Sequence, residues 1–219
     1  AREVADFFLD ELLRNGTTTA MVFATTHKAS VDAIFAAAEA RAMRLIAGKV
    51  LMDRNVPAAV RDTADSGYAD SKALIAKWHG RDRLAYAVTP RFAPTSTEPQ
   101  LGLCGRLLDE HPGVFLQSHV AENRGEVAWV AELFPRSRSY LDVYDRYGLL
   151  RPRAVYAHCI HLDAVDRHRM AASGAAMSFC ATSNLFLGSG LFDVRAAHEA
   201  GVRVGLGTDV GGGTSLSML

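Results

Sequence analysis

Three residues with metal-binding side chains each follow an apolar, strand-like run: His119, His158 and Asp209. The runs cover residues 114–118, 154–157 and 202–208. When parallel strands end at the same edge of a sheet, the side chains that follow them point toward a common place. Neutral imidazole and carboxylate are ligands that zinc commonly takes in proteins. The pattern therefore predicts a divalent metal site formed by these three residues.

Glu122 adds a second carboxylate to this candidate site, three residues after His119. At that spacing the carboxylate can reach a metal-bound water. His158 could either bind the metal or orient that water. Asp209 follows a buried strand, where an isolated charge is costly, and a metal would supply its partner. The alternative interpretation is that the histidines are hydrogen-bonded residues at the rim of a sheet.

Two further histidines lie near strand-like runs and are weaker candidates. His27 follows the run at 17–23, whereas His161 comes three residues after His158 and is expected to face solvent in a loop. The three cysteines are far apart and form no C-x-x-C pair, which argues against a disulfide framework or a cysteine-based zinc site and favours a reducing cytosol. The glycine-rich stretch at 205–213 lacks the ending of a phosphate-binding loop.

Strand-like and helix-like segments alternate along the chain, which predicts an α/β fold with buried parallel strands. The seven expected strands are one fewer than the eight of a (β/α)8 barrel, which is the favoured fold. A doubly wound open sheet is the competing fold. Ser30 and Ser71 are the expected N-caps of two of the intervening helices. Residues 1–219 are expected to form one partial barrel domain. The expected strands cover 17–23, 45–51, 84–88, 114–118, 154–157, 175–179 and 202–206.

The charge and hydropathy of the chain exclude several classes of partner. The formal net charge is +0, so strong attraction to nucleic acid or to an anionic membrane is not expected. No apolar stretch approaches the roughly 20 residues that a membrane-spanning helix needs, and no signal peptide is recognisable. Nucleic acid and membrane are therefore not expected as partners.

Four segments together resemble the guanine deaminases of the amidohydrolase superfamily. They are Val-Thr-Pro-Arg-Phe at 88–92, Gln-Ser-His-Val-Ala-Glu-Asn-Arg at 117–124, Ala-Thr-Ser-Asn-Leu at 181–185 and the glycine-rich stretch at 205–213. The spacing between the segments also agrees, and the resemblance extends over essentially all 219 residues. The ending Gly-Thr-Asp is shared by many amidohydrolases, whereas the first two segments together are more specific to guanine deaminases.

The resemblance implies a distorted (β/α)8 barrel, here with strands 2 to 8, and one zinc ion that activates a water. His119 and Asp209 would bind the metal, while His158 would join them or hold the water. Glu122 would shuttle protons, and with His158 and Asp209 it would form the catalytic set. The implied reaction is hydrolytic deamination of guanine to xanthine and ammonia in cytoplasmic purine catabolism, by a homodimer.

The resemblance also implies a set of substrate contacts. Arg91 would bond the purine carbonyl, and Phe92 would pack on the purine ring, since a guanidinium fork and an aromatic face suit a flat heterocycle. His119, Glu122 and Asp209 would complete the substrate site around the reacting carbon.

The chain departs from the family pattern in one feature that bears on its activity. Family members carry an H-x-H pair that supplies two zinc ligands, and this chain contains none. The pair is expected to precede Ala1, and a C-terminal region is expected to follow residue 219, so the isolated segment is expected to be inactive. Two alternatives stay open: a sibling amidohydrolase acting on a triazine or an adenosine-type substrate, and a non-catalytic fragment.

Overall fold

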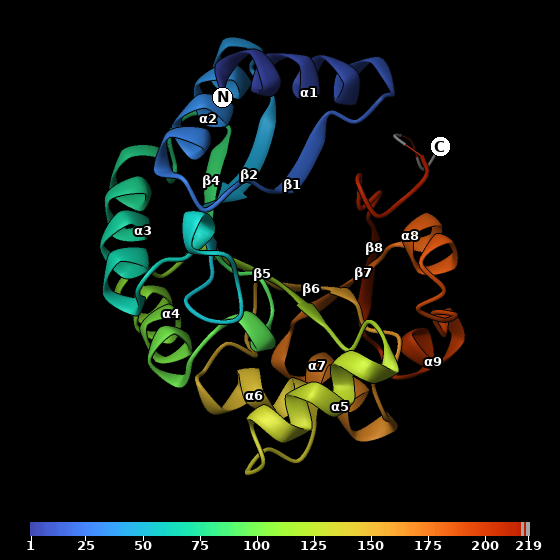
Figure 1. Cartoon of the computed structure of the whole chain (residues 1–219). Helices are drawn as coiled ribbons and strands as arrows, with labels where there is room; N and C mark the ends of the chain where they lie inside the picture. Colours follow the sequence, from blue (N-terminus) through green and yellow to red (C-terminus); the bar gives the residue numbers. More distant parts are fainter. Residues whose placement is uncertain (216, 218–219) are drawn as a thin grey trace. The chain divides into compact units, whose positions relative to one another are not determined.

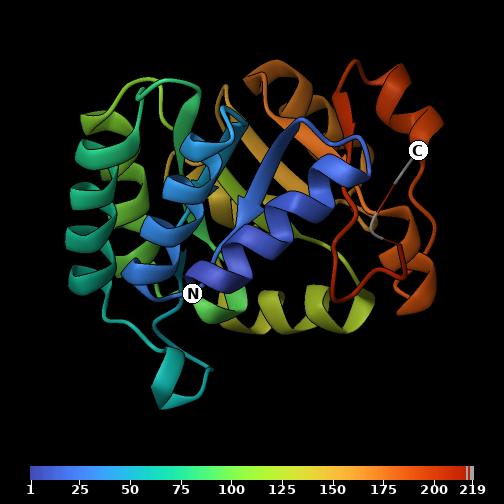
Figure 2. The same cartoon turned by 90° about the horizontal axis from the view of Figure 1, so that it is seen from above.

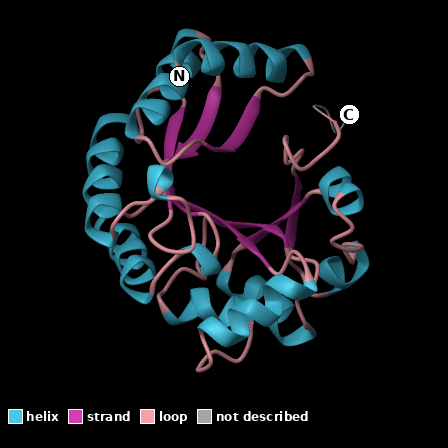
Figure 3. Ribbon diagram, viewed as in Figure 1, coloured by secondary structure: helices cyan, strands magenta, loops and turns pink. Residues whose placement is uncertain are grey.

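The computed structural model describes residues 1–215 and 217. These residues pack as two compact units, one formed by Ala1–Arg91 and Thr95–Leu116 and the other by Phe92–Pro94 and residues 117–215 and 217. Each unit contains parallel strands with helices packed against them (Figure 3). Within the described residues, no helix is both long and apolar enough to cross a membrane. The expected single domain over residues 1–219 stays a prediction.

The first unit alternates helices and strands, as the periodicity predicts (Figure 1). Strands β1, β2 and β4 lie side by side and parallel, and the short β3 pairs with the end of β4. Helix α3 lies between α2 and α4 (Figure 2). The elements are α1 (Arg2–Arg14), β1 (Thr19–Phe23), α2 (Lys28–Ala40), β2 (Arg44–Gly48), β3 (Val50–Leu51), η1 (Ala58–Val60), α3 (Ala64–Trp78), β4 (Leu84–Pro90), α4 (Glu98–Glu110) and the start of β5 (Phe115–Val120).

The strand expected at 45–51 is interrupted at Lys49, so the described residues contain eight strands instead of the seven expected. Gly48 lies so close to β4 that a Cβ on it would be 1.8 Å from the carbonyl oxygen of Ala87. The Lys49 N–H donates to the hydroxyl of Tyr86, 3.2 Å away. The prediction of one continuous strand was wrong because the interruption comes from contacts with β4, which lies far along the chain. The other expected strands are confirmed.

The two expected serine N-caps were wrong. Helix α2 begins after His27, and α3 begins after Thr63. Thr63 and Ser66 form a capping box, in which each side chain bonds the backbone N–H of the other. Ser71 is instead buried inside α3 and hydrogen-bonds the hydroxyl of Tyr86 at 3.1 Å. Both helices therefore start earlier than the apolar periodicity alone indicates.

The second unit contains the end of β5 and the parallel strands β6, β7 and β8 in that order. Side chains at the N-caps start several helices: Asn123 accepts from the N–H of Glu126, and Asp163 accepts from the N–H of Asp166. The remaining elements are η2 (Ala93–Thr95), which joins both units, and α5 (Arg124–Leu133), α6 (Tyr140–Arg146), β6 (Ala154–His158), α7 (Ala164–Ser173), β7 (Ala176–Phe179), α8 (Ala181–Phe186), α9 (Val194–Glu199) and β8 (Arg203–Leu206).

Candidate metal centre

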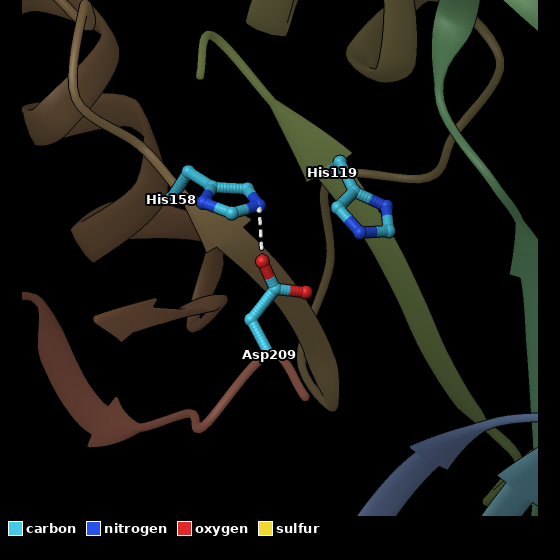
Figure 4. Close-up of side chains that lie close together, drawn as sticks. All are labelled: His119, His158 and Asp209. Atoms are coloured by element: carbon cyan, nitrogen blue, oxygen red, sulfur yellow. Dashed lines mark ion pairs between the residues drawn. The ribbon is translucent and has the colours of Figure 1, made fainter. Parts of the chain in front are cut away.

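The side chains of His119, His158 and Asp209 converge in the second unit (Figure 4). One ligand atom from each residue can be chosen so that all of them lie within 4.8 Å of one another. His119 lies in β5, His158 ends β6, and Asp209 follows β8. The rings of His119 and His158 stack with centroids 5.4 Å apart. Three strand ends thus bring two imidazoles and a carboxylate to one point.

The backbone at these strand ends is strained. Ala121, His158, Cys159 and Asp209 all have positive φ, at 51°, 70°, 54° and 47°. Each such residue costs about 1–3 kcal/mol and persists only where surrounding contacts enforce it. Those contacts are present: the N–H of Cys159 donates to the Val120 carbonyl at 3.0 Å, and the Asp209 carbonyl accepts from Gly212 at 3.0 Å. Such strain is typical of functional sites, because it fixes side-chain directions that regular strands do not offer.

Asn184 fixes the ring of His158. His158 Nδ1 lies 2.9 Å from the Asn184 Oδ1, which can only accept, so Nδ1 carries the proton. The other ring nitrogen, Nε2, lies 3.6 Å from Glu122 Oε2 and 4.0 Å from Asp209 Oδ2. Both His158 and Asn184 are almost fully buried. In the neutral ring, Nε2 therefore presents a lone pair to the space between two carboxylates.

Glu122 is held by a residue far along the chain. The hydroxyl of Ser189 donates to Glu122 Oε1 at 3.0 Å, while Oε2 faces His158. Ser189 is itself anchored, since its N–H donates to the Asn184 carbonyl at 2.9 Å and its carbonyl lies 3.0 Å from His161 Nε2. His161 is thus part of the support for this loop, and the expectation that it faces solvent was wrong.

A glycine makes room for the carboxylate of Asp209. A Cβ on Gly212 would lie 2.8 Å from Asp209 Oδ2 and 3.0 Å from the hydroxyl of Ser183. At Gly213 a Cβ would lie 2.2 Å from the Thr208 carbonyl oxygen. Close packing around Asp209 therefore requires glycine at positions 212 and 213.

The donor set fits a divalent cation such as zinc. It offers imidazole nitrogen and carboxylate oxygen, and the ring of His158 is oriented by a hydrogen bond on its other nitrogen, as is usual for histidine ligands. The two carboxylates near His158 Nε2 bring negative charge together, and a cation between them would offset their repulsion.

The other predicted site residues each make contacts within their own unit. Arg91 ends the first stretch of the first unit, where its N–H donates to the Leu51 carbonyl at 3.2 Å and its guanidinium Nη1 is 3.9 Å from Met52 Sδ. Phe92 belongs to the second unit and meets the ring of Trp129 edge-on, with centroids 6.5 Å apart. His27 precedes α2 in the first unit and is not part of the cluster.

The sequence model of the amidohydrolase family matches residues 1–219. The chain belongs to the amidohydrolase family. This agrees with the predicted α/β fold class with parallel strands. The fold is of the (β/α)8 type, and this chain is a partial segment of it. Triazine hydrolase from Arthrobacter aurescens, 22% identical with a TM-score of 0.84, shares the fold over 94% of this chain and 47% of its own.

Several guanine deaminases are similar to this amidohydrolase chain in sequence. It is 52% identical to guanine deaminase from Escherichia coli (strain K12) over 219 residues, which are 50% of that protein, and 35% identical to the enzyme from Dictyostelium discoideum over 49% of its length. The chain spans about half the length of the curated relatives it matches. The resemblance to guanine deaminases stated from the four segments is confirmed.

Two solved guanine deaminases share the structure of the chain. The E. coli enzyme superposes with a TM-score of 0.98 at 51% identity, covering 99% of this chain and 50% of that one. Guanine deaminase from C. acetobutylicum, described with bound guanine in the active site, superposes with a TM-score of 0.93 at 31% identity. The match covers 97% of this chain and 52% of that one.

Sequence reasoning missed the supporting residues of the site. Asn184 enters the sequence prediction only within the segment at 181–185, and Ser189 and Gly212 have no predicted role of their own. The partners of Asn184 and Ser189 are 26 and 67 residues away along the chain. The one available signal was the cluster of small polar residues directly after β7, where polar groups at a buried strand end need partners.

Proposed function

We propose that the protein carrying this chain converts guanine to xanthine and ammonia by hydrolysis. The observation that carries the proposal is the convergence of His119, His158, Asp209 and Glu122 in a chain that is 52% identical to a guanine deaminase. A related structure described with guanine in its active site supports the choice of substrate. A structural neighbour described as complexed with zinc, atrazine chlorohydrolase TrzN, supports a metal-dependent hydrolase.

Zinc is the metal that we assign to the site. His119 and Asp209 would hold it, and His158 Nε2 would either join them or hold the attacking water. When bound, zinc acts as a Lewis acid that lowers the pKa of a water toward 7. The side chains of this chain would carry out proton transfer and bind the substrate.

Two carboxylates would move the protons. Asp209 would accept a proton from the water as the water oxygen attacks C2 of guanine. That proton would pass to Glu122, which would deliver it to ring nitrogen N3. The proton of the resulting C2 hydroxyl group would then pass through Asp209 and Glu122 to the amino group, so that the C2–N bond breaks and ammonia departs. The hydroxyl of Ser189, on Glu122 Oε1, leaves Oε2 directed toward the reacting groups. His158 would keep the water oriented through its bond to Asn184.

Arg91 and Phe92 would recognise the substrate. The guanidinium would donate to the purine carbonyl, and the Phe92 ring would pack on the purine face. His119, Glu122 and Asp209 would surround the carbon that loses its amino group. We further propose that the protein acts in purine catabolism, in the cytoplasm, as a homodimer, and that residues 1–219 form one domain within it.

The experiment is a substrate comparison with the whole protein. We expect guanine to be consumed with stoichiometric xanthine and ammonia, and with a higher kcat/KM than adenosine or an s-triazine. Arg91→Ala should lower kcat/KM for guanine about 100-fold, the loss of a charged hydrogen bond to substrate. Faster turnover of adenosine or a triazine than of guanine would overturn the proposal in favour of a sibling deaminase.

A further inference from the structure

One buried hydroxyl in the second unit joins the metal centre to the segment that carries Phe92. Tyr144, on α6, is fully buried. Its hydroxyl donates to the backbone carbonyl of His119 at 2.7 Å.

The same hydroxyl accepts two hydrogen bonds. The N–H of Ala93, the residue after Phe92, donates to it at 3.0 Å. The Oγ of Ser118 lies 2.9 Å away, and because the single Tyr144 proton is used on His119, Ser118 must be the donor. A phenol has one proton to donate, and here that proton goes to the backbone carbonyl of His119.

We propose that Tyr144 is a positioning residue that sets the Phe92 segment relative to the metal-binding strand end, and this rests on the guanine deaminase function proposed above. One link runs to the backbone of a metal-site histidine and the other to the residue beside the ring that would pack on guanine. A rigid ring carries both links. It packs at a tilt of 37° against Tyr156, with centroids 5.1 Å apart, and stacks on Tyr140, with centroids 5.9 Å apart. The distance between the purine ring and the metal site would then be fixed.

Tyr144→Phe tests this idea, because it removes the hydroxyl and leaves the ring. Tyr156→Phe is a matched control: Tyr156 is equally buried, its ring packs against Tyr144, and its hydroxyl donates to the Leu149 carbonyl at 3.0 Å. In the whole protein, we expect Tyr144→Phe to raise KM for guanine about tenfold, as for one lost hydrogen bond, with kcat changed less than about threefold. It should also weaken zinc binding, measured by competition with a chelator, by about tenfold, as for loss of an outer-shell partner.

The control separates positioning from general stability. Both variants should lower the thermal midpoint to a similar degree, but Tyr156→Phe should leave KM and zinc affinity within about twofold of wild type. Equal effects of the two variants on KM and zinc affinity would overturn the proposal. Wild-type protein without guanine turnover would instead refute the proposed function, while the zinc comparison would still decide the positioning role.

A measurement on the wild-type protein guards against a variant that fails to fold. If Tyr144 couples the two segments, adding zinc should slow amide hydrogen exchange in the peptide covering residues 92–94 by at least about tenfold. The peptide around Leu149, which bonds Tyr156, serves as the reference and should change less. Equal slowing of both peptides, or none at 92–94, would contradict the coupling.

Discussion

Glycine at position 212 is dictated by the carboxylate of Asp209. A methyl group there would lie 2.8 Å from Asp209 Oδ2, so the carboxylate would have to shift. Because a metal ligand must hold its position within a fraction of an ångström, such a shift should be felt first in metal binding. The same reasoning does not apply to Gly205 on β8, where a Cβ would meet no heavy atom within 4 Å.

Gly212→Ala should therefore weaken zinc binding by at least about tenfold and lower guanine turnover accordingly, in line with the loss of other supporting contacts. Zinc affinity measured by chelator competition checks this, with Gly205→Ala as the control that should stay near wild type. Equal zinc affinities in the two alanine variants would show that Asp209 is not held in the way described.

At the scale of elements, helix α8 and the turn after it support two functional side chains at once. Asn184 bonds His158 Nδ1, and Ser189 bonds Glu122 Oε1, while the Ser189 N–H bonds the Asn184 carbonyl. Histidine ligands commonly depend on such an outer partner for orientation and basicity. A single short helix thereby couples the metal centre to the proposed proton carrier.

Asn184→Ala should lower metal affinity about 10- to 100-fold, because the His158 ring loses the bond that fixes its tautomer. The neighbouring Leu185→Ala is the control, since Leu185 is 65% exposed and contributes no bond to the site. Chelator competition on both variants tests the prediction. Unchanged affinity in Asn184→Ala would mean that the ring is held by other contacts.

The connection after β3 in the first unit is closed by a buried ion pair. The ammonium of Lys49, 1% exposed, pairs with the carboxylate of Asp62, and the Asp62 N–H donates to the Met52 carbonyl at 2.8 Å. Burial raises the pKa of Asp62 despite this pair. Removing one partner of a buried pair typically costs about 3–5 kcal/mol because the other charge is left uncompensated.

Lys49→Met should destabilise the protein by about that amount at pH 7, measured by urea denaturation. The loss should be smaller at pH 5, because a lone buried Asp62 carboxyl takes up a proton more readily. The double variant Lys49→Met/Asp62→Leu should recover much of the stability, since neither charge then stays buried. If the double variant were as unstable as the single one, the loss of stability would come from altered packing and not from an uncompensated charge.

At the scale of the whole molecule, Glu126 should make stability depend on pH. Burial beneath α6 raises the pKa of its carboxyl above 4.5, Tyr140 lowers it somewhat, and the charge of Glu122 raises it further. The folded state thus binds this proton more tightly than the unfolded state. Stability from this group is present below pH 4.5 and is lost as pH rises through the folded-state pKa.

Glu126→Gln should therefore be at least as stable as wild type at pH 7 and should show a flatter decline of the thermal midpoint from pH 5 upward. Glu132→Gln, on the exposed side of the same helix, should follow the wild-type curve. A larger midpoint loss for Glu126→Gln at pH 7 than at pH 5 would reverse the sign and refute the assignment.

The sequence predicts the regular parts of this fold better than its supporting contacts. Strand ends at His119, His158 and Asp209 follow from apolar runs, which depend only on neighbouring residues. The interruption at Lys49 depends on a close approach of Gly48 to Ala87, and the bond from Ser189 to Glu122 joins residues 67 positions apart. Contacts of this kind leave no periodic pattern, so only the folded structure reveals them.

Zinc-dependent turnover of guanine is the most direct measurement. Metal should be removed from the whole protein with a chelator and zinc returned stepwise, with xanthine formation followed at each step. We expect activity to rise in proportion to bound zinc and to level off at about one ion per chain. Asp209→Asn should not recover, whereas Asp193→Asn, which keeps an N-cap side chain on α9, should recover fully. Guanine turnover by the metal-free protein at the wild-type rate, or full recovery of Asp209→Asn, would contradict a metal-dependent guanine deaminase.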